Sequence, residues 1–303
     1  VLENTLIHGI THEEISLMMM QRINDEMHGE LNLAIKIFKD EYAKKFLHQL
    51  ISSQLDVDRL DYLRRDSFFT GVTEGNIGSA RIIKMLNVVD DSLVVESKAI
   101  YSIENYLTSR RLMYWSVYLH KTVVAYERTL INCIRRAEYL AKQGWDIFAS
   151  PALKYFLYND INADWFTSHP EALDMYSQLD DSDIWSAVKV WAQSDDKLLS
   201  MLADDVINRH IFKVEVREEP VSDEEQHELR KSLAEKAGIS YDDAGYLMSV
   251  NTIQKDMYDI NDDHISILYK DGTIKDITEA SELLNVDLLS KKIRKYYLCY
   301  QRL

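Results

Sequence analysis

The stretch SSQLDVDRLDYLRRDSFFTGV, residues 52–72, determines both the expected fold and the candidate site of this chain. Asp58, Tyr62 and Asp66 recur every four residues within it, so they share one stripe of a helix if the stretch is helical. The leucines fall elsewhere on that helix and are expected to face a core. Two carboxylates and a phenol flanked by arginines are suited to hold a divalent metal and a phosphorylated sugar. The alternative is a solvated helix face with local ion pairs.

Composition indicates a protein with a sizeable core. The chain has 303 residues, of which 46% are hydrophobic, so two domains are a reasonable expectation. Only three prolines and nine glycines occur, which favours long helices. No apolar run approaches the roughly 18–20 residues that span a bilayer, and the start lacks a signal-peptide pattern. We therefore expect a cytoplasmic protein without a membrane partner. Cys133 and Cys299 are expected to be core thiols rather than a disulfide.

The charge limits the possible ligands. A formal net charge of −15 argues against a general nucleic-acid binder, which needs a basic face. Local basic clusters, such as Arg110-Arg111 and Arg135-Arg136, could still receive phosphates. An acidic protein that binds an anionic substrate must gather cations, or a metal, in its pocket.

The order of patterns predicts a helical domain, residues 1–212, and a small α+β module, residues 213–303. Thr11 and Glu14 form a capping box that opens the first helix. Helical patterns follow at 29–50, 52–66, 102–142, 150–158, 170–178, 183–193 and 195–205, with a loop at 69–79 and a hairpin at 86–97. The module is expected to contain a strand at 211–219, a helix at 222–237, a hairpin at 264–277, a helix near 279–285 and a strand at 295–300.

A second polar stripe lies in RRLMYWSVYLHKTV, residues 110–123. Arg110, Tyr114, Tyr118 and Lys121 fall within an arc of roughly 80° if one helix continues through them. Two cations and two phenols suit an anion and a ring to stack on, and an exposed or interface face is the alternative. The pair His12-Glu13 lies at the positive end of a helix dipole, although such a pair is usually only solvated.

These residues carry a resemblance to a known family. The 52–72 stretch, YLHK at 118–121 and RHIFKVE at 209–215 resemble HD-domain phosphohydrolases of the deoxynucleoside triphosphate triphosphohydrolase type, over roughly residues 1–215. The resemblance implies a mainly helical HD-domain fold that holds a divalent metal through His…His-Asp…Asp. It also implies hydrolysis of a dNTP to a deoxynucleoside and triphosphate.

The resemblance assigns roles by position. Asp58 matches the last metal ligand, and Arg59 matches a basic residue that contacts the substrate phosphates. Tyr62 and Asp66 match residues that line the deoxyribose, with Asp66 on its 3′-hydroxyl. The remaining matches are His12 as a catalytic histidine with Glu13 beside it, and Arg110, Tyr118 and Lys121 as phosphate and sugar contacts.

Two features depart from the family pattern. Tyr114 stands where relatives often have a histidine, which changes the expected pocket contacts. The chain also contains no His-Asp dipeptide. In the family that element lies just before a segment like the one that begins at Val1, so we expect three of the four metal ligands to be missing. Because one carboxylate cannot replace the hydration shell of a metal, this chain is expected to be inactive and its parent protein active.

The sequence leaves several choices open. The metal could be Mg, Mn, Fe, Co or Ni. A metal-free HD-like scaffold that binds a nucleotide or forms a subunit interface is the main alternative. A cyclic-dinucleotide or (p)ppGpp hydrolase is a third, which the DVDRLDY run disfavours. The family further implies homo-oligomers and an allosteric nucleotide, for which Arg209 and Lys213 are the candidates, with interdomain ion pairs as the alternative.

Overall fold

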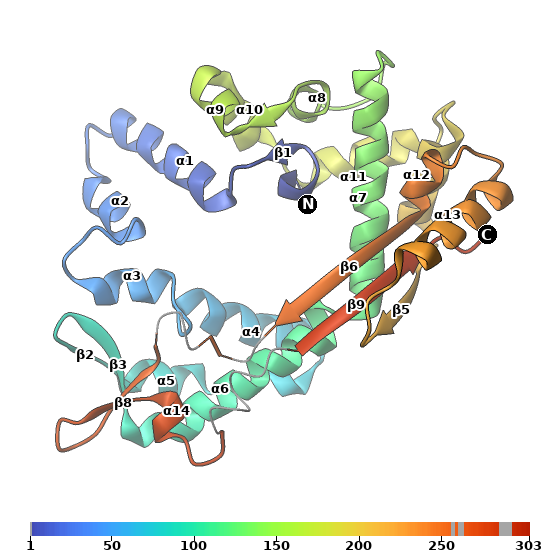
Figure 1. Ribbon diagram of the computed structural model, residues 1–303. Coiled ribbons are helices and arrows are strands. Elements are labelled where there is room, and N and C mark those ends of the chain that lie inside the picture. Colours follow the sequence, from blue (N-terminus) through green and yellow to red (C-terminus); the bar gives the residue numbers. More distant parts are fainter. Residues whose placement is uncertain (1, 256–257, 260–263, 285–292) are drawn as a thin grey trace. The chain divides into compact units, whose positions relative to one another are not determined.

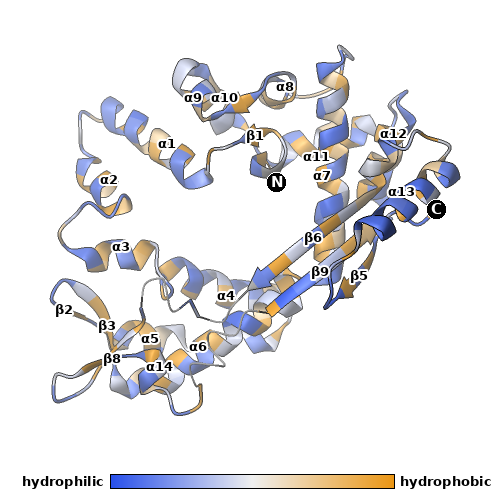
Figure 2. Cartoon of the chain, viewed as in Figure 1, coloured by the Kyte–Doolittle hydropathy of each residue, from blue (hydrophilic) through white to orange (hydrophobic). Residues whose placement is uncertain are grey.

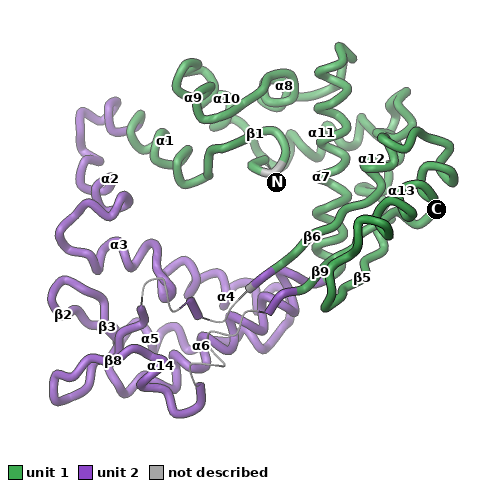
Figure 3. Tube along the Cα trace, viewed as in Figure 1, with its two compact units in different colours: residues 1–22, 121–253, 295–303 green, residues 23–120, 254–294 purple. Residues whose placement is uncertain are grey.

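The computed structural model describes residues 2–255, 258–259, 264–284 and 293–303, and most of them are helical (Figure 1). The predicted fold class, mainly α with a smaller α+β part, is confirmed. The chain forms two compact units (Figure 3). Unit 1 contains residues 1–22, 121–253 and 295–303, and unit 2 contains residues 23–120 and 254–294. Among the described helices, none is both long and apolar enough to cross a membrane.

Unit 1 is built around one long amphipathic helix, α7 (Lys121–Lys142). The other elements of this unit are η1 (Leu2–Asn4), β1 (Ile7–His8), α1 (His12–Glu26), α8 (Pro151–Tyr158), β4 (Ile161–Asn162), α9 (Ala163–Ser168), α10 (Glu171–Gln178), α11 (Asp181–Trp191), α12 (Lys197–Asn208), β5 (Lys213–Arg217), α13 (Asp223–Ala237), η5 (Asp243–Leu247), β6 (Met248–Lys255) and β9 (Ile293–Tyr300). The last residues of α1 and β6 and the first two of β9 fall in unit 2. The sheet order is β5-β9-β6, and β5 runs antiparallel to β9.

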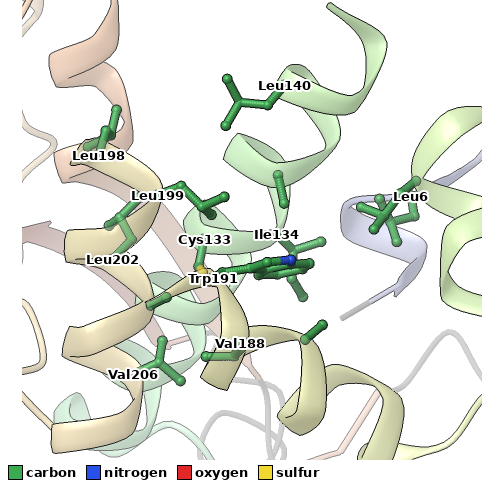
Figure 4. Packing of buried hydrophobic residues seen from close by; sticks show 14 of the residues in the cluster. Leu6, Cys133, Ile134, Leu140, Val188, Trp191, Leu198, Leu199, Leu202 and Val206 are labelled. Carbon is green, nitrogen blue, oxygen red and sulfur yellow. The ribbon is translucent and has the colours of Figure 1, made fainter. Parts of the chain in front are cut away.

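The core of unit 1 lies where α7 meets α11 and α12. Figure 4 shows Trp191 of α11 beside Cys133 and Ile134 of α7, with leucines of α12 completing the cluster. Trp191 is 2% exposed, and its indole N–H donates to the Phe148 carbonyl at 2.8 Å, so its polar atom is satisfied. Figure 2 shows the contrast with α13, which is hydrophilic along most of its length.

Unit 2 consists of shorter helices and a small sheet. Its elements are α2 (Asn32–Phe38), α3 (Lys45–Ile51), α4 (Val57–Thr70), η2 (Thr73–Gly75), α5 (Ser79–Met85), β2 (Leu86–Val89), β3 (Ser92–Glu96), η3 (Ser97–Ala99), α6 (Ile100–Met113), the π-helical turn η4 (Tyr114–Tyr118), β7 (Ser266–Leu268), β8 (Ile274–Asp276) and α14 (Ile277–Ala280). Leu60 and Leu63 of α4 are buried in its core, as expected.

Residues late in the chain complete the sheet of unit 2. The strand order is β2-β3-β7-β8, and β3 pairs in parallel with β7, with Val95 opposite Ile267. Residues 213–303 are therefore shared between the two compact units. The predicted domain boundary at residue 212 stays a prediction. The two compact units are a different division, with boundaries at other positions of the chain.

Most of the predicted elements are confirmed. The capping box is present, since the Thr11 amide donates to Glu14 Oε2 at 2.8 Å and the Glu14 amide donates to Thr11 Oγ1 at 3.2 Å. The hairpin at 86–97 and the strands at each end of the 264–277 hairpin also form. Cys133 and Cys299 are buried free thiols. The predicted helix near 279–285 is α14, shorter and earlier, and residue 285 lies outside the described residues.

Two predicted helices are wrong in their length. The helix at 29–50 is divided into α2 and α3, because Asp40 between them takes a positive φ of 55° that no helix allows. The helix at 102–142 is divided into α6, η4 and α7. In η4 the Leu119 amide donates to the Tyr114 carbonyl at 2.7 Å, a widened turn of five residues after which α7 starts again at Lys121.

Candidate functional site

The site begins at the first turn of α4. Asp56 is the N-cap, and its carboxylate accepts from the Arg59 amide at 2.7 Å, so α4 begins at Val57, five residues later than predicted. The Arg59 guanidinium folds back onto the Asp56 carboxylate and the Ser53 carbonyl. Burial is the largest influence and opposes the charge of Arg59, but the Asp56 carboxylate and the nearby tyrosines together raise its pKa. Asp58 is exposed on the same turn.

Asp66 and three tyrosines meet in unit 2. The Tyr118 hydroxyl donates to Asp66 Oδ2 at 2.8 Å, which joins η4 to α4 across 52 residues of sequence. The ring of Tyr118 meets those of Tyr62 and Tyr114 edge-on, with centroids 5.9 and 5.6 Å apart. Burial, and then the hydrogen bond to Asp66, raises the pKa of Tyr118. Burial also raises the pKa of Tyr62, so these phenols stay neutral and can donate hydrogen bonds.

Arg110 of α6 brings a positive charge to this group. Its Cζ lies 5.9 Å from the centroid of the Tyr114 ring. Burial raises the pKa of Tyr62 and of buried Tyr106, and the charge of Arg110 acts against this larger effect. Because Arg110 influences both phenols, its guanidinium lies near them. The Nε and Nη1 atoms of Arg110 are buried and have no hydrogen-bond partner among the described residues. A buried guanidinium nitrogen without an acceptor is costly, so an anion there would supply what the protein lacks.

The structure therefore brings together five of the predicted site residues within unit 2. They are Tyr62, Asp66, Arg110, Tyr114 and Tyr118. The continuous-helix prediction behind the second stripe was wrong, yet Tyr114 and Tyr118 still face this group through the π-helical turn. Such turns are frequent at functional sites because they redirect side chains that a regular helix would send elsewhere.

Three other predicted site residues, His12, Glu13 and Lys121, belong to unit 1. The imidazole of His12 lies between two carboxylates, with Nδ1 3.0 Å from Glu3 Oε1 and Nε2 3.1 Å from Glu13 Oε1. His12 also lines a cleft of about 550 Å³ with Tyr176 and Trp185 among its walls. Lys121 starts α7, so it does not share a helix with Arg110.

The residues around Asp58 do not fit a metal. Metal sites need several ligands within reach of one ion. Within the described parts of the chain, the one group of three or more His, Cys, Asp or Glu ligand atoms within 4.8 Å of one another is Asp204, Asp205 and His210. Asp58 thus offers a single carboxylate, and we assign no chemical step to a metal bound there.

Two residues of the site escaped the sequence prediction. The first is Asp56, whose carboxylate accepts a hydrogen bond from the Arg59 guanidinium. An aspartate just before a helical run is a cap signal, so the sequence could have revealed Asp56. Tyr106 lies fully buried beneath the site, and its hydroxyl donates to the Gln54 carbonyl at 2.7 Å. Nothing in the sequence distinguishes Tyr106 from an ordinary core aromatic residue.

Comparison with known proteins places the chain in a family. Residues 77–145 match the HD associated region. A phosphohydrolase from Bacteroides thetaiotaomicron, solved as a crystal structure, is 63% identical and superposes with a TM-score of 0.95. The match covers 99% of this chain and 75% of that one. The chain therefore belongs to the HD-domain phosphohydrolase family.

Curated relatives are more distant. The uncharacterized protein YwfO of Bacillus subtilis is 30% identical over 88% of this chain and 59% of its own length. The deoxynucleoside triphosphate triphosphohydrolase SAMHD1 homolog of Dictyostelium discoideum is 25% identical over 43% of this chain and 28% of its own length. The chain thus spans less than two thirds of the curated relatives that it matches.

Proposed function

We propose that this chain supplies the substrate pocket of a metal-dependent dNTP triphosphohydrolase, which releases a deoxynucleoside and triphosphate. The observation that carries the proposal is the pair of buried Arg110 nitrogens that have no partner in the described ranges, in the same group of side chains as Tyr114 and the Asp66–Tyr118 pair. A cation that lacks an acceptor beside aromatic rings and a carboxylate matches the parts of a nucleotide: phosphate, sugar ring and hydroxyl. The name of the Dictyostelium relative supports the same substrate class.

Each residue of the pocket has a distinct task in this proposal. Arg110 donates to a phosphate oxygen and neutralises charge that develops there during hydrolysis. Asp66 accepts a hydrogen bond from the 3′-hydroxyl while it keeps its bond from Tyr118. Tyr62 and Tyr114 lie against the sugar. Arg59 can reach a phosphate only by exchanging Asp56 for it, so we rank its contribution below that of Arg110.

The rest of the catalytic machinery is proposed from family membership. HD-domain phosphohydrolases are generally metal-dependent, so we propose that the complete protein binds a divalent metal, one of Mg, Mn, Fe, Co or Ni. His12 would move a proton, with Glu13 holding its ring, and Lys121 would contact phosphate. Since Asp58 stands without companion ligands among the described residues, we expect this chain to bind nucleotide without hydrolysing it.

Partners form part of the same proposal. An allosteric nucleotide at Arg209 and Lys213 would have to displace the bonds that Lys213 makes to the Tyr300 hydroxyl, at 2.7 Å, and to Glu215. A homo-oligomer would cover Phe68 and Phe69, which are 80% and 79% exposed at the end of α4. We place this oligomer in the cytoplasm.

One observation favours a second candidate. The isolation of Asp58 among the described residues also suits a metal-free HD-like scaffold that binds a nucleotide without catalysis. Both candidate functions use the same nucleotide pocket, but only the triphosphohydrolase would hydrolyse the bound nucleotide.

The test measures binding by this chain and hydrolysis by the product of its complete gene. We expect calorimetry to give tighter binding of a dNTP than of its 2′,3′-dideoxy analogue by about tenfold, since a hydrogen bond to a charged group contributes roughly 1.5 kcal/mol. Asp66→Ala should abolish this preference. Asp61→Ala is the matched control, because Asp61 is an exposed carboxylate of the same helix that pairs with Arg65.

Hydrolysis decides between the two candidates. With Mg²⁺, Mn²⁺ or Co²⁺ the complete protein should release triphosphate from dNTPs, and Asp58→Ala should abolish this release while leaving the melting temperature unchanged. Binding without turnover under all three metals would favour the scaffold. Failure of the chain to bind any dNTP, or release of monophosphate instead of triphosphate, would contradict the proposed function.

A further inference from the structure

The C-terminal end of α12 gathers three metal-ligand side chains that the proposed function does not use. His210 Nδ1 lies 3.8 Å from Asp204 Oδ2 and 3.9 Å from Asp205 Oδ1. We propose that Asp204, Asp205 and His210 form a binding site for a divalent transition metal, with Zn²⁺ as the best match, in unit 1 of this protein.

Both carboxylates are oriented by amide groups. Asn208 Nδ2 donates to Asp204 Oδ1 at 2.8 Å, and Gln301 Nε2 donates to Asp205 Oδ2 at 2.6 Å. Each carboxylate therefore has one oxygen held by an amide and the other directed at the imidazole. Outer hydrogen bonds of this kind fix the orientation of metal ligands and strengthen metal binding.

Gln301 provides an independent sign of a missing ligand. Its side chain is only 8% exposed, and its amide ends at Asp205. The Oε1 atom of that amide is buried and has no hydrogen-bond partner among the described residues. A buried carbonyl oxygen normally has a partner, and a cation or a water bound to that cation would provide one.

Charge also favours a cation here. Asp205 is 5% exposed, and among the described ion pairs its one basic neighbour is His210. A buried carboxylate is costly without a paired charge. The negative end of the α12 dipole adds to the same local potential.

The backbone conformation after α12 explains why the His210 side chain lies beside the last turn of that helix. Arg209 ends α12 in the left-handed conformation, with φ 58°. The His210 amide then donates to the Asp205 carbonyl at 3.0 Å, which turns the imidazole towards the last turn of α12. The site thus joins the end of α12, the segment before β5 and the residues after β9.

The donor set selects the class of metal. Two carboxylates suit Mn²⁺ as well as Zn²⁺, whereas an imidazole nitrogen disfavours Mg²⁺ and Ca²⁺. At metal–ligand distances of about 2.1 Å, tetrahedral ligands lie roughly 3.4 Å from one another. The observed separations of 3.8 and 3.9 Å need only a small closure to reach that geometry.

Calorimetric titration of the chelator-treated chain with Zn²⁺ tests the site. We expect one equivalent to bind, and His210→Ala and Asp205→Asn each to weaken it by more than about tenfold. His210 is mostly exposed, so its variant should fold. Two control variants should still bind one equivalent of Zn²⁺. They are His8→Ala, which removes another exposed histidine of unit 1, and Asp58→Ala, in unit 2.

Co²⁺ provides a second readout, because its visible absorption reports the ligands directly. The absorption should change in His210→Ala and stay the same in His8→Ala. The proposal would be overturned if the chain bound no stoichiometric Zn²⁺ or if His210→Ala bound Zn²⁺ with unchanged affinity. Loss of Zn²⁺ binding in Asp58→Ala would overturn it as well. None of these outcomes depends on nucleotide binding, so the two proposals can fail separately.

Discussion

Two pairs of neighbouring arginines, Arg110-Arg111 in α6 and Arg135-Arg136 in α7, have the same sequence pattern but different surroundings. Arg136 is buried and fully paired. Its Nε and Nη2 bind Asp196 at 3.1 and 2.7 Å, and its Nη1 binds Asp243 at 2.7 Å. Arg110 instead leaves two buried nitrogens without a partner among the described residues.

The difference separates a structural cation from a candidate ligand-binding one. Arg136 fastens α7 to the N-cap of α12 and to η5, and it satisfies carboxylates that the fold itself supplies. Within the part of the chain that the structure describes, no carboxylate pairs with Arg110, although Asp66 lies in the same group of side chains and is held by Tyr118. Arg110 is half-buried, and a cation whose buried nitrogens lack a partner in the described ranges is the better candidate for an anionic ligand.

The largest effect is expected at Arg136. Arg136→Met should lower the free energy of unfolding by about 3 kcal/mol, because it leaves two carboxylates of a partly buried network without their cation. Urea unfolding followed by circular dichroism measures the change. Arg135→Met is the control, since Arg135 is exposed and should change stability by less than about 0.5 kcal/mol. Equal losses in both variants would contradict the structural role of Arg136.

Local signals in the sequence predicted most of the fold, because caps and turns are determined by neighbouring residues. Thr11 and Glu14 formed the predicted capping box for this reason. The break after Met113 was not predictable from propensity, since YWSVY contains no glycine or proline and the π-helical turn depends on tertiary packing.

The candidate site was predictable in its residue types and unpredictable in its pairings. Spacing grouped Tyr62 with Asp66 and Tyr114 with Tyr118, and the structure joins both groups. Spacing could not show that Arg136 finds acceptors 60 and 107 residues away while two buried nitrogens of Arg110 find none among the described residues. Long-range partners of this kind depend on the packing of helices, which local patterns do not encode.

An intermediate effect is expected at Arg110, in binding rather than in folding. Arg110→Met should weaken dNTP affinity by about 10- to 100-fold, or roughly 1.4–2.7 kcal/mol, since one charge-assisted phosphate contact is lost. The melting temperature should stay the same or rise, because the variant removes two buried nitrogens that lack a partner among the described residues. Calorimetry and thermal unfolding measure the two quantities, with Arg111→Met as the neighbouring control. A fall in stability that matches the fall in affinity would make Arg110 a structural residue like Arg136.

The smallest effect concerns Arg217, a cation that is paired at the surface. Its guanidinium binds Glu215 at 2.6 Å and Glu225 at 2.7 Å. Hydrogen bonds from Arg217, and then from the Tyr300 hydroxyl, lower the pKa of Glu215 to about 2 from an ordinary value of 4.5. A carboxyl group whose pKa is lower in the folded state stabilises the fold above pH 4.5, and this contribution is lost as the pH falls towards 2.

Glu215→Gln should therefore cost about 1 kcal/mol at pH 7 after solvent screening of a partly exposed group. The difference from the unaltered chain should shrink between pH 4.5 and pH 3, because acid removes the same charge from Glu215. Urea unfolding at pH 7, 4 and 3 measures this convergence, and Glu218→Gln, at an exposed neighbouring position, is the control. If the difference in unfolding free energy stayed constant with pH, the Glu215–Arg217 pair would stabilise the fold through packing instead of charge. The surface pair would then differ from the buried pairing of Arg136 in its physical origin as well as in its magnitude.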